Sequence, residues 1–386
     1  MSLYFDSEHQ LFRQTVRRFV EQEINPYVDE WEAAECFPAH ELFKKMGSLG
    51  LLGLSYPVEY GGGGLDYWYN VVMFEEIGRA MCGGVPMAIG VHSDMATPAL
   101  AEHGSDELRR EFLAPAIAGD IVFAIGVSEP DAGSDVASIR TRAVSDGDDY
   151  VINGTKMWTT NGTQADVITL LARTSEGRGF RGMSLILVPT DTPGFSVSRK
   201  LVKLGMHSSD TAILSFDNVR VPKRYRIGEE GMGFPLQMQQ FQKERLIGSV
   251  MALAGAEVAI EMTVEYTKHR KTFGKPIIEN QWVHFKLAEL LTEIEALRQL
   301  NYHCTRLMIA GKDATKEVSM AKLKCGQLVR QVADTCVQFH GGMGYVEDYP
   351  IARYYRDSRL LSIGGGADEI IMGIIAKYAG LFPSKE

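Results

Sequence analysis

The sequence predicts a mostly α-helical protein with a β domain in the middle of the chain. Helical spacing of apolar residues gives way to short β-rich runs near residue 120, and long helical patterns return after Gly233. The length of 386 residues is also more than one hydrophobic core usually serves. We therefore expect an N-terminal helical domain over 1–120, a β-barrel or β-sandwich domain over 121–232 and a C-terminal four-helix bundle over 233–386.

The N-terminal domain is expected to consist of helices joined by tight turns. Its apolar residues keep a helical spacing from Asp6 to about Gly119. Turn signals interrupt this pattern at the Asn-Pro pair of 25–26, the glycine run of 61–64 and the glycine pair of 83–84.

The middle domain is marked by four short runs of β-forming residues, each bounded by Gly, Asp, Asn or Pro. These runs are Tyr150–Ile152, Val167–Ala172, Ser184–Val188 and Ile213–Phe216. A Gly-x-Gly-x-x-Gly pattern at 177–182 lies between two of them. A dinucleotide-binding turn must lead from a strand directly into a helix, so we expect a hairpin loop here and not a Rossmann fold.

The C-terminal domain contains four stripes of apolar residues at helical spacing, which is the pattern of a helix bundle. The stripes are Leu246, Val250, Leu253 and Ala254; Leu287, Leu290, Leu291, Ile294 and Leu297; Cys325, Val329, Val332, Cys336 and Phe339; and Ile370, Ile371, Ile374, Ile375 and Tyr378.

Composition excludes several classes of protein. With 45% hydrophobic and 23% charged residues the chain is not intrinsically disordered, and a net charge of −9 disfavours nucleic-acid binding. No uninterrupted apolar run approaches the roughly 20 residues of a membrane span. The amphipathic pattern begins at the N-terminus with no signal or transit peptide before it, so a cytoplasmic location is expected.

The cysteines and histidines do not suggest a metal site. The five cysteines form no C-x-x-C pair and have mostly apolar neighbours, which favours buried, reduced thiols. None of the nine histidines lies at ligand spacing from another His, Cys or carboxylate on a clear shared face. We expect no bound metal.

The first of two segments that suggest a cofactor site reads AIGVSEPDAGSD, from Ala124 to Asp135. Its glycines and proline exclude a helix, and they leave backbone amides and the hydroxyls of Ser128 and Ser134 available. Such a loop suits an anionic cofactor.

The second segment reads KMWTTNG, from Lys156 to Gly162, and carries an indole two residues before a hydroxyl. On a regular extended strand Trp158 and Thr160 project from the same face. The ring would then stack on a planar heterocycle while the hydroxyl binds its edge, a geometry that suits a flavin. Alone, a Trp near a Thr is most often part of a core.

Two further motifs follow in the C-terminal third. The segment RKTFG occupies 270–274, and QFHGGMGY occupies 338–345. With the two earlier segments and a following Arg-Asp pair, in this order and spacing, the chain resembles the acyl-CoA dehydrogenase family over essentially its whole length.

The resemblance implies an FAD cofactor, an electron-transfer flavoprotein as electron acceptor and a homotetramer in which each flavin site is shared between subunits. Arg270 matches an arginine that meets the pyrophosphate of a neighbour's FAD, and Gln338–Gly342 matches a segment at its adenosine end. The residues implied to bind the cofactor are Ile125, Val127, Ser128, Gly133, Ser134, Trp158, Thr159, Thr160, Arg270, Thr272, Phe273, Gln281, Gln338, Gly341, Gly342, Ala367 and Glu369.

The chemistry of such an enzyme needs a base for the α-proton of the acyl thioester and hydrogen-bond donors for its carbonyl. Many family members carry a glutamate before the last helix in a segment YEGT, but this chain has Gly365 there. Long-chain and isovaleryl-type members use a glutamate before an arginine instead, which corresponds to Glu244. We expect Glu244 to be the base and the Gly365 backbone amide to be the donor, with Asp368 and Glu369 as rival carboxylates.

The acyl pocket is expected along the helix of 85–91. Gly90 stands where medium-chain members carry a larger polar residue, so this pocket should be deeper or wider. The residues implied to contact substrate are Met87, Gly90, Ser134, Phe241, Arg245, Gly365 and Gly366. Two stretches, CGGVPMAIGVHSDM and GGGADEIIM, are most similar to the citronellyl-CoA dehydrogenase type, which implies a 3-methyl-branched terpenoid acyl-CoA, although a long straight chain is an alternative.

Two other functions are compatible with the residues. One is an oxidase or nitroalkane-oxidising relative that uses oxygen as acceptor, which no residue excludes. The other is a non-enzymatic acyl-CoA- or flavin-binding scaffold, which the glycine at position 365 suggests and Glu244 argues against.

Overall fold

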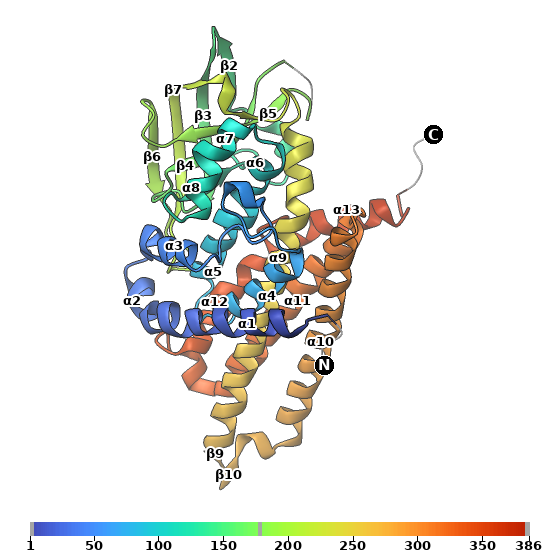
Figure 1. Cartoon of the computed structure of the whole chain (residues 1–386). Helices are drawn as coiled ribbons and strands as arrows, with labels where there is room; N and C mark the ends of the chain where they lie inside the picture. Colours follow the sequence, from blue (N-terminus) through green and yellow to red (C-terminus); the bar gives the residue numbers. More distant parts are fainter. Residues whose placement is uncertain (1–3, 177–179, 383–386) are drawn as a thin grey trace.

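The computed structural model describes residues 4–176 and 180–382. Helices surround a twisted sheet that lies at one end of the molecule, and a long helix, α9 (Gly233–His269), runs from the sheet to the opposite end (Figure 1). The predicted architecture, helical then β then helical, is confirmed.

The N-terminal helices are short and are joined by tight turns and by π-helical segments. They are α1 (Ser7–Phe19), α2 (Val28–Ala33), α3 (Ala39–Ser48), α4 (Tyr67–Ile77), α5 (Gly84–Gly90), α6 (Pro98–His103), α7 (Asp106–Leu108) and α8 (Ala114–Ile117). The sequence explains where α1 starts, because the Asp6 carboxylate accepts hydrogen bonds from the amides of Glu8 and His9. The Asn-Pro pair of 25–26 forms a short 3₁₀ helix.

The sheet follows the order β6-β7-β3-β2-β4-β5-β8, and β1 pairs parallel with β4. Its strands are β1 (Phe123–Gly126), β2 (Arg142–Asp146), β3 (Asp149–Thr160), β4 (Val167–Arg173), β5 (Met183–Pro189), β6 (Phe195–Lys200), β7 (Thr211–Pro222) and β8 (Arg226–Ile227). The four predicted runs lie on β3, β4, β5 and β7. Residues 177–179 of the Gly-x-Gly-x-x-Gly pattern lie outside the described residues, between antiparallel β4 and β5.

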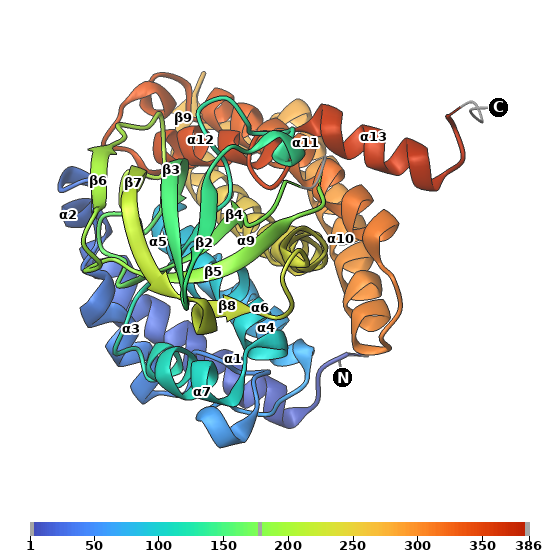
Figure 2. The ribbon, with the colours of Figure 1, turned by 90° about the horizontal axis from the view of Figure 1, so that it is seen from above.

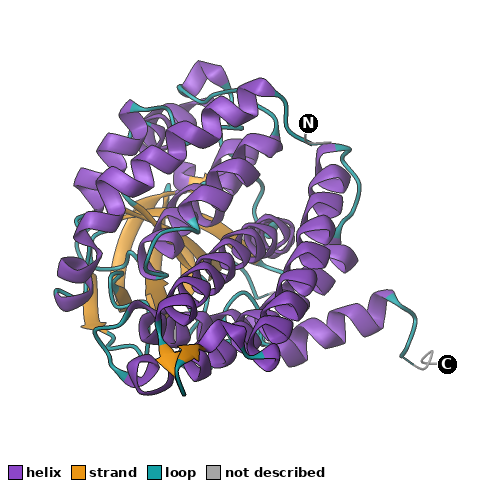
Figure 3. Ribbon diagram, turned by 90° about the horizontal axis from the view of Figure 1, so that it is seen from below, coloured by secondary structure: helices purple, strands orange, loops and turns teal. Residues whose placement is uncertain are grey.

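The C-terminal helices form the other half of the molecule (Figures 2 and 3). They are α9, α10 (Gln281–Ile309), α11 (Thr315–His340), α12 (Pro350–Ser358) and α13 (Asp368–Tyr378), and a small hairpin of β9 (Lys271–Thr272) and β10 (Lys275–Pro276) joins α9 to α10. The fourth predicted stripe lies on α13, but of its apolar residues only Ile371 is buried within this chain. The end of α13 extends away from the body in Figure 2.

Helix α9 is the one described helix that is long and apolar enough to cross a membrane by length and composition. Its apolar window has 56% of its residues buried in the protein, so it serves as the central core helix. Leu246 and Val250 belong to a core shared with α4 and α11, whereas Phe241 packs against a second core that includes Val127 and Leu185 of the β domain. The first part of α9 therefore lies where both cores meet.

Candidate active site

The two segments that suggested a cofactor site lie side by side. The Met157 amide donates to the Ser128 carbonyl at 2.9 Å. Below this contact the buried Lys156 ammonium donates to the Val127 carbonyl and to Glu129 Oε1, each at 2.9 Å. Burial lowers the pKa of Lys156 to about 8, and the Glu129 carboxylate opposes that shift. A buried ion pair thus fixes the loop to the strand from beneath.

The strand that carries Trp158, β3, is not regular. The prediction that Trp158 and Thr160 lie on a regular extended strand is therefore wrong. A bulge shifts the register of β3 against β7 between Lys156 and Thr159, and Trp158 has φ of +66°. The indole is consequently 60% exposed, whereas the Thr159 side chain is buried and Thr160 is half-buried. The exposed, flat indole provides a wall on which a planar heterocycle would stack, and Ser134 of the first segment is exposed as well.

Glu244 and Gly365, which are far apart in the sequence, reach the same point in space. A Cβ atom built on Gly365 would lie 3.9 Å from Glu244 Oε1. The neighbouring Arg245 donates through Nε to the Gly365 carbonyl at 3.0 Å. The carboxylate of Glu244 therefore lies where a glutamate side chain at position 365 would begin.

The amides of Gly365 and Gly366 form no hydrogen bond with any described residue. Both glycines have positive φ, +65° and +104°, which a residue with a side chain adopts only with strain. Of the rival carboxylates, Asp368 is buried 3.8 Å from Lys322, and Glu369 is exposed on the first turn of α13.

The electrostatics of Glu244 suit a base. Burial raises the pKa of its carboxyl to about 7, and the guanidinium of Arg245 opposes that shift. A carboxyl with such a pKa takes up a proton near neutral pH more readily than an exposed glutamate.

Because the base must be ionised, we expect kcat/KM of the FAD-loaded protein for an acyl-CoA to rise with pH and to level off above about 7. Below that value activity should fall roughly tenfold per pH unit. A steady-state pH profile checks this. A flat profile across the neutral range would contradict the assignment of Glu244.

A large apolar cavity starts one helical turn after Glu244. It contains about 730 Å³ of empty space, part of it open to solvent. One face of α9 lines it, with residues that recur at helical spacing: Gly248, Met251, Ala252, Gly255, Val258 and Met262. Residues four apart share a helix face, so Glu244 lies on the same face of α9 as Gly248, one turn before the residues that line the cavity.

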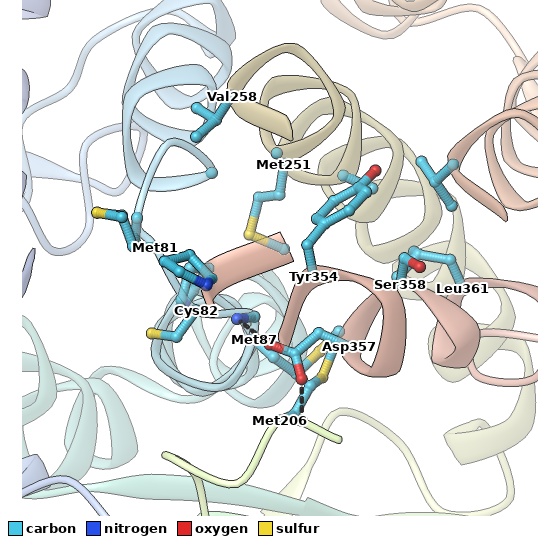
Figure 4. Close-up of a pocket in the computed structure, with 18 of the residues that line it drawn as sticks. Met81, Cys82, Met87, Met206, Met251, Val258, Tyr354, Asp357, Ser358 and Leu361 are labelled. Atoms are coloured by element: carbon cyan, nitrogen blue, oxygen red, sulfur yellow. Dashed lines mark hydrogen bonds between the residues drawn. The ribbon is translucent and has the colours of Figure 1, made fainter. Parts of the chain in front are cut away.

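The opposite walls come from α5 and α12, as Figure 4 shows. Met87, which was predicted to contact substrate, lines the cavity together with Tyr354. Gly90, also predicted, lies behind the wall, where an added Cβ would meet Met251 Cε at 3.3 Å. A larger residue at position 90 would therefore press Met251 into the cavity and make it shallower.

One end of the cavity is formed by residues that the sequence reasoning missed. The Asp357 carboxylate accepts hydrogen bonds from the Gly83 amide at 2.8 Å and from the Met206 amide. It therefore joins α12 to the N-terminal helical part and to the β part of the chain. Burial raises the pKa of Asp357 to about 6. The Arg-Asp pair noted in the sequence was the available signal, but it did not show that Asp357 faces a cavity.

Of the remaining predicted cofactor residues, Ala367 and Glu369 lie at the start of α13, and the others lie near the far end of α9. Arg270 is the C-cap residue of α9, and the fully exposed Phe273 lies in the turn between β9 and β10, whose place Figure 1 shows. The Gln338–Gly342 segment lies nearby, since Tyr266 stacks on His340 at 4.4 Å. From Glu244 to Arg270 the helix rises roughly 39 Å at about 1.5 Å per residue. Within one chain, Arg270 therefore lies far along α9 from Glu244.

Comparisons with known proteins cover the whole chain. Family models for the N-terminal, middle and C-terminal domains of acyl-CoA dehydrogenase match residues 6–120, 124–219 and 231–380. The mitochondrial long-chain specific acyl-CoA dehydrogenase of Sus scrofa is 40% identical over 97% of this chain and 86% of its own.

Solved structures of acyl-CoA dehydrogenases are similar to this chain over nearly its whole length. An acyl-CoA dehydrogenase from Geobacillus kaustophilus has a TM-score of 0.94 at 40% identity, over 98% of this chain and 100% of that one. A glutaryl-CoA dehydrogenase from Mycobacterium smegmatis in complex with FADH2 has a TM-score of 0.92 at 31% identity, over 99% and 97%.

Proposed function

Because this chain belongs to the acyl-CoA dehydrogenase family, we propose that it oxidises the Cα–Cβ bond of an acyl-CoA whose acyl chain is long or methyl-branched. The observation that carries the proposal is on α9, where a carboxylate of raised pKa, Glu244, lies one helical turn before Gly248, the first α9 residue that lines the apolar cavity. We place the domain boundaries near residues 120 and 232, as the sequence indicates.

The cofactor of the family, FAD, fits the residues present. The exposed Trp158 indole offers a stacking surface, and Ser128, Gly133 and Ser134 offer amides and hydroxyls around it. A Cβ on Gly133 would meet no atom within 4 Å, so the space above this loop is open. When bound, FAD supplies the acceptor for the hydride that leaves the β-carbon.

The side chains of this protein would supply the rest of the chemistry. The ionised Glu244 carboxylate takes the α-proton, and negative charge then develops on the thioester oxygen. The unpartnered Gly365 amide donates a hydrogen bond to that oxygen, where its effect is greatest because the charge is new. The burial of Glu244 keeps the pKa of its carboxyl raised, so that it can take up a proton near neutral pH.

The shape of the cavity supports the proposed substrate class. Gly248 and Gly255 leave space on α9, since a Cβ at the first position would meet no atom within 4 Å and one at the second would be in ordinary contact. Methionines such as Met87 and Met251 have flexible apolar side chains that adapt to an irregular ligand. A 3-methyl-branched terpenoid chain remains the narrower proposal, on the similarity of the two stretches quoted above.

The experiment is anaerobic bleaching of the FAD-loaded protein by a panel of acyl-CoAs, from butyryl- to palmitoyl-CoA, with isovaleryl- and citronellyl-CoA beside them. Fast bleaching only by citronellyl-CoA would support the narrow proposal. Fast bleaching by long straight chains would support a fatty-acid enzyme. No bleaching by any of them would favour a scaffold that binds acyl-CoA without turning it over.

Electrons are proposed to pass to an electron-transfer flavoprotein in a cytoplasmic compartment. The cysteines form no disulfide, and four of the five are buried, which suits a reducing environment. The oxygen-using alternative is tested by mixing the substrate-reduced protein with air. Rapid reoxidation without a protein acceptor would favour an oxidase.

We further propose a homotetramer in which the far end of α9 completes a neighbour's flavin site. The fully exposed Phe273 and the exposed apolar residues of α13 support such an assembly.

Replacing Arg270 by Ala should weaken FAD retention and tetramer formation together, because a guanidinium that binds pyrophosphate is lost. Gel filtration with in-line absorbance at the flavin band measures both. Lys271→Ala, which removes the adjacent exposed cation, is the matched control. A holo-tetramer of unchanged stability in the Arg270 variant would refute a shared site.

A further inference from the structure

Lys322 of α11 is a buried lysine beneath the loop that carries Gly365. Only 4% of its surface is exposed. Its ammonium donates to the Gly366 carbonyl, while the nearest carboxylate oxygen, Asp368 Oδ1, is 3.8 Å away. Its closest contact is thus a backbone carbonyl and not a counter-ion.

Such a position is costly for a lysine. Burial lowers the pKa of Lys322, Asp368 opposes the shift, and the nearby Arg245 adds to it. Two other groups face this region: Cys325, one turn along α11, and Arg330, whose guanidinium lies 3.6 Å from Asp368 Oδ2. The carboxylate of Asp368 therefore lies near two cations, Lys322 and Arg330, and the hydrogen bond of Lys322 goes to the backbone of the loop.

The loop is held at two successive carbonyls from two different helices. Arg245 of α9 binds the Gly365 carbonyl, and Lys322 of α11 binds the Gly366 carbonyl. Two adjacent glycines with positive φ have wide conformational freedom, so without these contacts the peptide planes would rotate. With them, the amides of Gly365 and Gly366 remain unbonded next to Glu244.

We propose that Lys322 is a positioning residue for the reaction: by holding the Gly366 carbonyl, while Arg245 holds the Gly365 carbonyl, it restrains the glycine loop and so keeps the Gly365 amide where it meets the thioester oxygen. The inference rests on the proposed function, because it assumes that this amide is the oxyanion donor. Misplacement of such a donor by about 1 Å is enough to cost roughly a hundredfold in rate.

The test separates this role from a structural one by measuring the acidity of a bound ligand. A 3-thia-acyl-CoA can lose its α-proton but has sulfur in place of the β-carbon, so it gives up no hydride. The deprotonated ligand against FAD gives a long-wavelength absorption band, and a pH titration of this band gives the ligand's apparent pKa.

In Lys322→Met we expect that apparent pKa to rise by about 1 to 2 units, a 10- to 100-fold weaker stabilisation of the anion. The Kd of the ligand in its neutral form should change little. Lys322→Arg, which keeps a cation at the site, should restore part of the shift. Lys324→Met, which removes an exposed lysine of the same helix paired with Glu293, is the control.

Asp368→Asn keeps the proposal falsifiable if Lys322→Met does not fold. It removes the ion pair but retains the contact of Lys322 with Gly366, so the ligand should titrate near the wild-type value. A shift in Asp368→Asn equal to that in a Lys322 variant would overturn the proposal in favour of a structural ion pair. An unchanged titration in Lys322→Met would also overturn it, whereas absence of the band in the wild-type protein would instead refute the proposed function.

Discussion

Replacing Glu244 by Gln is expected to reduce turnover of every acyl-CoA by about 10²- to 10⁴-fold while FAD and ligand binding remain intact. The amide keeps the size and polarity of the side chain but cannot accept the α-proton. No second carboxylate takes over: Asp368 lies behind the Gly365–Gly366 loop against Lys322, and Glu369 is exposed. Stopped-flow bleaching of the flavin measures the loss directly.

The control is Glu261→Gln on the same helix, which breaks an exposed ion pair with Arg79 and should change the free energy of unfolding by less than about 1 kcal/mol. Its bleaching rate should equal that of the wild type. Full activity in Glu244→Gln would show that the base is elsewhere, and a variant that loses its flavin would not separate catalysis from binding. The flavin absorbance per subunit is therefore measured first.

Replacing Gly248 by Leu should abolish activity on long-chain acyl-CoAs and spare short ones. The new side chain would project from the face of α9 that lines the cavity, one turn beyond Glu244, where a Cβ meets no atom within 4 Å. A chain that must pass this point would be excluded by sterics, at a cost of at least about 10²-fold in kcat/KM for palmitoyl-CoA. The helix itself should gain roughly 0.5–1 kcal/mol of stability, because glycine is a poor helix former.

The ratio of kcat/KM for butyryl- and palmitoyl-CoA is the measurement, and thermal unfolding confirms that the fold is kept. Gly248→Ala serves as the graded control, with a smaller shift in the same direction. An equal loss on both substrates would mean that the cavity is not the path of the acyl chain.

The order of the three parts of the fold could be predicted because period and composition change sharply at their borders. Strands β3, β4, β5 and β7 carry buried β-branched residues, and these four were found. Strands β2 (RAVSD) and β6 (FSVSRK) are mostly exposed, so they lack the apolar signal and were missed. The short α6, α7 and α8 depend on tertiary contacts more than on local periodicity.

For the site, the sequence named the segments but could not give their geometry. The proximity of Glu244 to position 365 came from family resemblance and agrees with the structure. The bulge at Trp158 and the role of Asp357 at the cavity could not be predicted, because both depend on how separate elements meet. Lys322 gave no signal, since a lone lysine in an amphipathic pattern is usually solvated.

The meeting of Glu244 and Gly365 has a consequence for how members of this family are compared. In an alignment the two positions are separate columns more than a hundred residues apart, and a chain with glycine in the second would be scored as a dead paralogue. In three dimensions the two positions meet, since Oε1 of the first lies 3.9 Å from where the side chain of the second would start. The glycine at position 365 therefore does not by itself mark the protein as inactive, because the carboxylate that the proposed reaction needs reaches the same place from α9.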